Sequence, residues 1–327
     1  MKFSINIIND VKINRILLNN IRIVYFKKIK EMYSLKNDFL HIHIKSKGAE
    51  LSSITSIKNK TEFMWQADPK VWEGHAPILF PIIGCMKNDS YIYNEETYPM
   101  TKHGFVRKSD DFKVISQSET EITFRIASNS DFYKMFPFQF ELDICYTLNE
   151  TILTINHIVR NLDSKTMYFS LGGHPAFTCP LHKDEMYTDY VLEFEKAEQS
   201  KSHLLNLSTF LVTDKTKDVF TTERTIQLHG KLFNEDALIF KDLTSRAVTL
   251  KHKSKGSVLT VRFKDFPFLG VWAKSNAPYV CIEPWIGIAD SEQTNQKIED
   301  KEGIIALVGG SDFSTSYSIE IDKSHLV

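Results

Sequence analysis

Apolar and mostly polar residues alternate without a break along residues 138–148, whose sequence is FQFELDICYTL. A period of two is typical of a strand with one buried face. The run Thr151–Val159 follows after only Asn149 and Glu150. The two runs therefore predict a hairpin, although the expected turn contains no glycine.

Shorter runs rich in Thr, Val, Ile, Tyr and Phe recur along the rest of the chain and favour strands. Few segments look helical, and no long Gly, Ser or Pro linker divides the chain. This spacing predicts an all-β fold, a single large antiparallel β-sandwich, rather than βαβ units. The additional expected strands are 39–44, 121–126, 166–171, 190–195, 247–250, 258–263, 268–273, 279–283 and 316–321.

The first 31 residues differ in composition from the remainder of the chain. They are rich in Ile, Asn and Lys, contain no Gly or Pro, and have neither an uninterrupted apolar region nor a small-residue cleavage site. Regular strand patterning begins at Phe39. We therefore predict that residues 1–32 are an N-terminal extension outside the fold, with Met32 the functional start, and that one domain spans 33–327. Deletion of residues 1–31 is expected to leave solubility and activity intact.

Charge and cysteine content exclude several classes of partner. Forty Lys plus Arg against 41 Asp plus Glu give a net charge of -1, so no field would attract nucleic acid or an anionic membrane. The four cysteines are scattered, without a C-x-x-C pair, which indicates reduced thiols in a cytoplasm. No apolar run approaches the roughly 20 residues of a membrane span. We expect a cytoplasmic protein, monomer or homodimer, that binds a small neutral molecule.

Cofactor and metal signatures are missing from the sequence. Gly84–Lys87 and Gly309–Ser311 match neither nucleotide-binding fingerprint. His41 and His43 alternate on one expected strand face, but no third ligand is near them in the sequence, so a solvated strand face is the better interpretation. We predict neither a cofactor nor a metal site.

Two proline-punctuated segments, about a hundred residues apart, supply one imidazole and one carboxylate. They are Gly172–Phe177, GGHPAF, and Cys281–Trp285, CIEPW. A histidine among apolar neighbours is more often an ordinary core residue, and a structural role for the glutamate is about as good as a functional one. If the fold brings His174 and Glu283 together, however, they form an acid and base able to move two protons at neutral pH.

Two further polar residues stand beside glycine or before an apolar run. His103 lies in a loop where Gly104 permits close backbone approach, which is compatible with a ligand contact but nonspecific. Asp236 precedes the apolar run Ala237–Phe240 and is by itself better explained as a turn cap.

Taken together, these segments resemble the aldose 1-epimerase, or galactose mutarotase-like, family, and especially a bacterial subgroup. The resemblance covers about residues 35–321 and includes Ser46–Leu51, Pro77–Pro81, His103–Phe105, the Asp236 segment Phe233–Phe240, Phe266–Gly270 and the two proline segments. It implies a β-supersandwich with a sugar pocket across one sheet. It also implies that His174 and Glu283 carry catalysis and that His103 and Asp236 contact sugar hydroxyls.

One position departs from the family pattern. The family often has Gly-Arg-x-x-Asn where this chain has Gly84–Asn88, so Asn88 is retained as a substrate-binding candidate but Cys85 replaces the arginine. A thiol is no substitute for a forked cationic donor. Lys87 or Arg107 would have to substitute, or the substrate differs, or activity on ordinary hexoses is weak.

The resemblance implies an aldose 1-epimerase (mutarotase) that interconverts the α and β anomers of an aldohexose without a cofactor. Two alternatives remain open, a hexose-6-phosphate 1-epimerase with a cationic grip on the phosphate and a noncatalytic carbohydrate-binding module. A glycosidase is disfavoured because hydrolysis normally uses two carboxylates about 5–10 Å apart.

Overall fold

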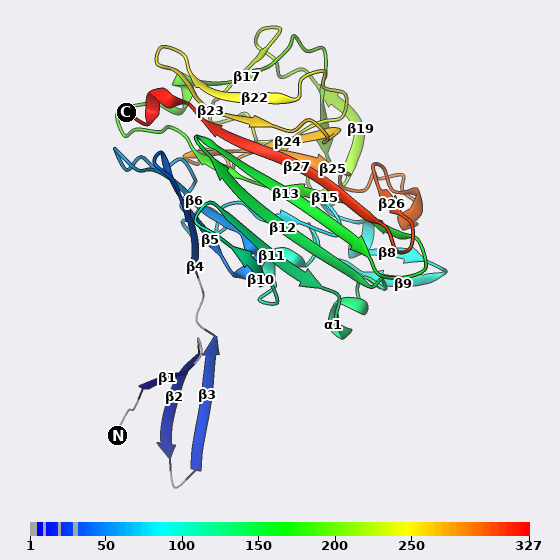
Figure 1. The fold of residues 1–327 in the computed structure, drawn as a ribbon. Coiled ribbons are helices and arrows are strands. Elements are labelled where there is room, and N and C mark those ends of the chain that lie inside the picture. Colours follow the sequence, from blue (N-terminus) through cyan, green and yellow to red (C-terminus); the bar gives the residue numbers. More distant parts are fainter. Residues whose placement is uncertain (1–4, 9–10, 19–20, 29–31) are drawn as a thin grey trace.

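The computed structural model describes residues 5–8, 11–18, 21–28 and 32–327. In this part of the chain almost all regular structure consists of antiparallel strands, and one short α-helix is present, α1 (Ser130–Tyr133). Two large sheets overlap in the view of Figure 1. The prediction of an all-β antiparallel sandwich is confirmed.

The larger sheet has nine strands and contains the hairpin expected from residues 138–159. In spatial order its strands are β10 (Lys113–Gln117), β11 (Glu121–Ala127), β12 (Phe140–Asn149), β13 (Ile152–Asn161), β27 (Asp312–Ile321), β23 (Gly256–Arg262), β22 (Ala247–His252), β17 (Tyr190–Phe194) and β20 (Thr225–Gln227).

The second sheet has eight strands and carries both proline segments. Its main path is β19 (Val212–Lys217), β18 (Ser202–Leu205), β21 (Leu238–Phe240), β24 (Phe268–Trp272), β25 (Tyr279–Ile286), β15 (Leu171–Gly173) and β7 (Ile78–Leu79), and β16 (Ala176–Thr178) pairs with β25 off this path.

Smaller sheets and single 3-10 turns complete the described structure. The strands are β1 (Ile5–Ile8), β2 (Val11–Leu18) and β3 (Ile21–Lys28) in one sheet, β4 (Met32–Lys36), β5 (Leu40–Lys45) and β6 (Leu51–Ser56) in another, and the pairs β8 (Ser90–Tyr93) with β9 (Glu96–Pro99) and β14 (Met167–Phe169) with β26 (Ile305–Leu307). The turns are η1 (Lys47–Ala49), η2 (Lys87–Asp89), η3 (Val106–Lys108), η4 (Tyr187–Asp189), η5 (Ile298–Asp300) and η6 (Lys323–His325).

The predicted N-terminal extension falls partly outside the described residues. Residues 1–4, 9–10, 19–20 and 29–31 belong to it and are not described. Strand pairing in the sheet of β4, β5 and β6 begins at Met32, earlier than the strand start expected near Phe39. The expectation that residues 1–31 can be deleted stays a prediction.

The hairpin of β12 and β13 is confirmed, with its turn one residue later than expected. Asn149 is the last residue of β12 and lies opposite Ile152, so the two-residue loop is Glu150–Thr151. Glu150 has a φ of 48°, in the left-handed region that glycine adopts most easily. The turn therefore forms without glycine by placing a glutamate in that conformation.

A close contact between the two sheets explains one glycine of the GGHPAF segment. Tyr317 on β27 and Gly173 on β15 meet in the buried interior, and a Cβ atom on Gly173 would lie 2.5 Å from the Tyr317 hydroxyl oxygen. A side chain at this position would force the sheets apart. The residue directly before His174 is thus held tightly against the opposite sheet.

Candidate active site

A cavity of about 240 Å³ opens on the eight-stranded sheet. It has room for about eight water molecules at roughly 30 Å³ each, a size that suits one sugar ring. Its wall combines polar and aromatic side chains, as binding sites for polar ligands commonly do. The polar members are Cys85, Lys102, His103, Arg107, His174, Asp236 and Glu283, and the aromatic ones are Trp72, Phe210, Trp272 and Trp285.

Strand register places His174 opposite Glu283. Gly172 of β15 pairs with Trp285 of β25, and Ala176 of β16 pairs with Cys281. Both pairs follow the same antiparallel register, so His174, midway between the two short strands, falls across from Glu283. His174 and Pro175 lie between β15 and β16 and belong to neither strand, whereas β25 continues past them. Proline lacks the N–H that strand pairing needs.

The two side chains are in contact but are not locked together. His174 Nε2 lies 3.2 Å from Glu283 Oε2, and both residues are buried. Among the described residues, His174 Nδ1, Glu283 Oε2 and Trp285 Nε1 make no well-aligned hydrogen bond, although the Trp285 indole is close enough to the Glu283 carboxyl to oppose the rise of its pKa. Buried polar atoms are normally satisfied. These three therefore point to a site that is completed by a polar ligand.

Two tryptophans fix the imidazole from the sides. The ring of Trp72 stacks on His174 with centroids 5.0 Å apart and an interplanar angle of 27°. Trp272 of β24 meets the same imidazole edge to face at 5.8 Å. The ring is therefore held in one orientation by packing, as a group that transfers protons to a bound ligand requires.

Burial moves the pKa values of the pair in opposite directions. It raises the pKa of the Glu283 carboxyl well above its ordinary value, against the opposing field of Lys102. It lowers the pKa of His174 to about 3. Both shifts favour the neutral form of the group. Burial thus opposes the carboxylate form of Glu283 and the imidazolium form of His174.

His103 lies against the His174 ring and lines the same cavity. Its Nδ1 accepts a hydrogen bond from the Gly84 backbone N–H at 3.1 Å, so the proton of the neutral ring is on Nε2. The His103 and His174 rings meet edge to face at 5.7 Å. Burial, followed by the neighbouring His174, holds the pKa of His103 well below its ordinary value, so the ring stays neutral.

The backbone at His103 is shaped by the glycine that follows it. His103 and Gly104 have φ values of 64° and 71°. A Cβ on Gly104 would lie 2.0 Å from the Phe80 carbonyl oxygen. Because only glycine fits there, the sequence His103-Gly104 fixes how the imidazole enters the cavity.

Asp236 and Arg107, two of the candidate substrate-binding residues, line the cavity. Asp236 has a φ of 68°, and its Oδ1 accepts a hydrogen bond from the Ala237 backbone N–H at 2.7 Å. The aspartate thus caps its turn and also faces the cavity. Arg107 lies in η3, shortly after His103 in the chain. Its Nη2 donates to the Lys102 carbonyl oxygen at 3.1 Å.

Asn88 lies on the exposed side of its turn and is not among the residues that line the cavity. Its Nδ2 donates to Gln296 Oε1 at 3.2 Å. Lys87 is also outside the cavity wall, with its Nζ donating to the Glu292 carbonyl oxygen at 2.9 Å. A contact of Asn88 with sugar stays a prediction that this geometry does not favour.

Cys85, at the usual arginine position, does face the cavity. Burial raises the pKa of its thiol, so the group is neutral. The cations that share its cavity are Lys102 and Arg107, whereas the alternative substitute Lys87 is turned away. Lys102 also lies over the Phe210 ring, with Nζ 4.8 Å from the centroid.

Sequence reasoning missed Trp72, Lys102 and Trp272. Trp72 precedes β7 in an irregular segment that carries no periodic signal. Lys102 is adjacent to His103, and this adjacency is the signal that could have identified it. Trp272 ends a strand that the sequence predicted, so its position at the cavity follows from sheet order, which the sequence did not reveal.

One group of described side chains has the composition of a metal site. Ligand atoms of His174, Cys281 and Glu283 all lie within 4.8 Å of one another. Burial raises the pKa of the Cys281 thiol well above its ordinary value, so the metal-binding thiolate is disfavoured. A metal here would also occupy both members of the acid–base pair. The absence of a metal from the reaction stays a prediction.

Comparison with known proteins indicates the family of the chain. The family model described as aldose 1-epimerase matches residues 31–301. The protein LacX, chromosomal, of Lactococcus lactis subsp. lactis is 38% identical over 295 residues, which are 88% of this chain and 98% of that protein.

Solved structures agree with this assignment. A galactose mutarotase related enzyme from Lactobacillus acidophilus has a TM-score of 0.83 and 34% identity, covering 89% of this chain and 97% of that one. A galactose mutarotase-like protein from Lactobacillus casei has a TM-score of 0.83 and 30% identity over 89% and 100% of the two chains. In the described part of this chain, no helix has the length and apolarity to cross a bilayer.

Proposed function

Because the chain belongs to the aldose 1-epimerase family, we propose that it interconverts the α and β anomers of an aldose by acid–base catalysis. The observation that carries the proposal is the buried contact of His174 Nε2 with Glu283 Oε2, 3.2 Å, in the wall of a cavity of one-sugar size. A cyclic hemiacetal needs one group beside its C1 hydroxyl and one beside its ring oxygen, and this pair supplies both.

Ring opening moves one proton from substrate to protein and one from protein to substrate. Glu283 as carboxylate accepts the proton of the C1 hydroxyl while protonated His174 donates a proton to the ring oxygen, and the bond between C1 and that oxygen breaks. The product is the open-chain aldehyde. Rotation about C1–C2 followed by the reverse transfers closes the ring with the other configuration.

The proton content of the ligand-free pair fits this cycle. A carboxylate with an imidazolium and a carboxylic acid with a neutral imidazole hold the same single proton. The first state opens the ring, and the second is what remains beside the open chain. Burial favours the second state, so the free site is already poised for ring closure and exchanges states without taking up or releasing a proton.

Three neighbours would hold the sugar while the pair acts. His103, whose neutral ring carries its proton on Nε2, would donate toward developing charge on oxygen. Asp236 and Arg107 face the same cavity and are available to sugar hydroxyls. Trp72 and Trp272 provide flat apolar walls for the faces of a pyranose ring.

The rate of mutarotation should depend on pH as a broad bell. His174 should set its acid limb and Glu283 its alkaline limb, which is the reverse of the order of the ordinary pKa values of histidine and glutamate. The acid limb arises when the pair gains a second proton on His174, whose pKa is lowered to about 3, so activity persists well below pH 6. The alkaline limb arises when the pair loses its proton from Glu283, whose pKa is raised. Rates of mutarotation from pH 4 to 10, corrected for the buffer-catalysed reaction, check this. An acid limb centred near 6.5 would contradict it.

Polarimetry or NMR of freshly dissolved α-anomers, across a panel of hexoses, tests the proposed function directly. The expected result is anomerisation faster than in buffer alone. A noncatalytic carbohydrate-binding module would instead shift the NMR signals of the sugar without changing the rate, and an aryl glycoside left uncleaved would exclude a glycosidase.

A further inference from the structure

The segment Trp72–Pro77 borders the backbone of His174 on the side of β7. None of its residues belongs to a strand. The His174 N–H nevertheless donates to the Pro77 carbonyl oxygen at 3.1 Å, and the Ala176 N–H donates to the His75 carbonyl oxygen at 2.8 Å. On this side, irregular chain therefore holds the backbone of the imidazole-bearing residue.

The same segment carries the Trp72 ring, which stacks on the His174 imidazole with centroids 5.0 Å apart. The indole packs closely against Gly74, where a Cβ would lie 2.6 Å from Trp72 Cζ2. The Trp72 carbonyl oxygen accepts a hydrogen bond from Trp65 Nε1 at 2.9 Å. The conformation of residues 72–77 thus sets both the backbone and the ring plane of His174.

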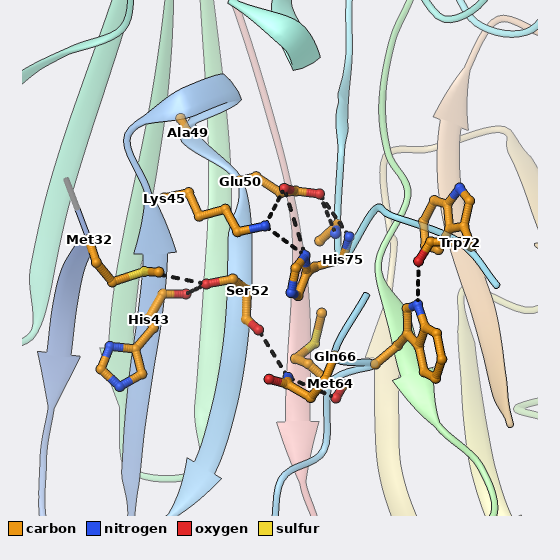
Figure 2. Close-up of polar contacts among 12 residues, drawn as sticks. Met32, His43, Lys45, Ala49, Glu50, Ser52, Met64, Gln66, Trp72 and His75 are labelled. Atoms are coloured by element: carbon orange, nitrogen blue, oxygen red, sulfur yellow. Dashed lines mark hydrogen bonds and ion pairs between the residues drawn. The ribbon is translucent and has the colours of Figure 1, made fainter. Parts of the chain in front are cut away.

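The Glu50 carboxylate holds this segment through two backbone hydrogen bonds. Its Oε1 accepts from the N–H groups of His75 and Ala76 at 2.8 and 3.2 Å (Figure 2). Both residues lie between Trp72 and Pro77, so the carboxylate fixes the middle of the segment. Hydrogen bonds to a charged acceptor are stronger than those between neutral groups.

Glu50 is itself firmly placed. Its carbonyl oxygen accepts a hydrogen bond from the Lys45 N–H at 2.8 Å, and the Tyr146 hydroxyl donates to the carbonyl oxygen of the preceding Ala49 at 2.7 Å. This second bond connects the start of β6 to β12 of the larger sheet. The side chain of Glu50 is only 14% exposed.

The second carboxylate oxygen of Glu50 is also satisfied. Oε2 lies 3.4 Å from Lys45 Nζ, which in turn lies 2.9 Å from His75 Nδ1 (Figure 2). Burial, followed by the charge of Lys45, lowers the pKa of His75 to about 4, so its ring is neutral and accepts from the ammonium group. The carboxylate, the ammonium and the imidazole form one closed cluster behind the segment.

We propose that Glu50 is a positioning residue: by holding the N–H groups of His75 and Ala76, it fixes the orientation of the His174 imidazole. The inference rests on the proposed function and adds a residue that does not line the cavity of His174 and Glu283. A misplacement of about 1 Å at a reacting group can cost roughly a hundredfold in rate, so such a support should be visible in kcat.

Glu50 also acts through its charge, which the test must separate from its reach. Burial lowers the pKa of Arg107 in the cavity wall, and the carboxylates of Glu73 and Glu50 oppose this shift. Glu50→Asp keeps the charge but shortens the side chain, which withdraws the carboxylate from the two N–H groups. Glu50→Gln keeps the length and a carbonyl oxygen as acceptor but removes the charge.

We expect Glu50→Asp to lower the kcat of mutarotation at least about tenfold and Glu50→Gln to stay close to the wild type. Glu198→Asp is the matched control. Glu198 is also a buried glutamate, it accepts from the N–H groups of Thr244 and Ser245 at 3.0 and 2.6 Å, and it does not line the cavity. Its variant should keep the wild-type kcat.

Three kinetic results would overturn the positioning role. They are a wild-type kcat from Glu50→Asp, an equal loss in Glu50→Asp and Glu50→Gln, which would assign the effect to charge, and an equal loss in Glu198→Asp, which would assign it to general stability.

The imidazole NMR signals of His174 report its placement without any turnover. The ring current of the stacked Trp72 shifts these signals, which are assigned by their loss in His174→Asn. We expect them to move in Glu50→Asp and to stay in Glu50→Gln and Glu198→Asp. Unmoved signals in Glu50→Asp would overturn the inference even if the rate fell. If the wild type accelerated no sugar, the proposed function would fail, and these signals would still decide whether Glu50 positions the ring.

Discussion

Replacement of His174 by Asn is expected to reduce the kcat of mutarotation by about a hundred- to ten-thousandfold, the usual contribution of a positioned proton donor. Asn is close to the imidazole in shape but has no titrating proton. The stacking surface of Trp72 and the backbone hydrogen bond of residue 174 to the Pro77 carbonyl oxygen both remain. Binding should therefore change much less than the rate.

Glu283→Gln should have a similar effect for the complementary reason. The amide keeps the shape and removes the base that accepts the C1 proton, and in addition it relieves a buried carboxyl of its burial cost. We therefore expect this variant to be inactive but at least as stable as the wild type, a combination that loss of folding would not produce.

Measurement of kcat and KM by NMR exchange, with sugar binding followed separately by calorimetry, checks both variants. His229→Asn changes an exposed histidine outside the cavity and is the matched control. Wild-type rates from either His174→Asn or Glu283→Gln would remove that residue from the mechanism.

The strands of the fold were predictable because their pattern is local. In β12, Leu142, Ile144 and Tyr146 are buried as the alternation requires. Every residue of β25 is buried, and apart from Glu283 the strand has an apolar sequence. The turn after β12 was displaced by one residue because Glu150 adopts a left-handed φ, which no sequence rule for glycine-poor turns specifies.

The acid–base pair could also be predicted from the sequence, since glycines and a proline flank His174 and a proline follows Glu283. The residues that surround the pair could not be predicted. Trp72 and Lys102 reach the cavity through irregular segments, and their positions depend on how loops pack on the sheet rather than on any local period. Asn88 illustrates the reverse case, a position matched by resemblance whose side chain bonds to Gln296 instead of facing the cavity.

Lys301→Met is expected to lower the free energy of unfolding by about 3–5 kcal/mol, the usual cost of leaving one member of a buried ion pair alone. Lys301 Nζ lies 2.6 Å from Asp290 Oδ1, and each side chain is only 2% exposed. Burial lowers the pKa of Lys301 and the carboxylate of Asp290 opposes this shift. Without the ammonium, the donor left to the Asp290 carboxylate among the described residues is the neutral Lys87 N–H.

This ion pair lies next to the candidate site, so its loss should also disturb the cavity. The Asp290 N–H donates to the Cys85 carbonyl oxygen at 2.9 Å, and the Val212 N–H donates to the Asp290 carbonyl oxygen at 2.8 Å. The segment at Asp290 thereby connects the loop that bears Cys85 to β19. We expect Lys301→Met to lower activity together with stability.

A second substitution separates the charge from the packing. Asp290→Asn/Lys301→Met contains no uncompensated charge and should recover most of the lost stability, because replacing both partners of a buried pair is often nearly neutral. Lys323→Met breaks the exposed pair of Lys323 and Glu150 and should cost no more than about 1 kcal/mol. Urea unfolding of the four proteins measures these differences. If Lys301→Met cost no more than Lys323→Met, or if the double variant were less stable than Lys301→Met, the buried charge would not be what stabilises this corner of the cavity.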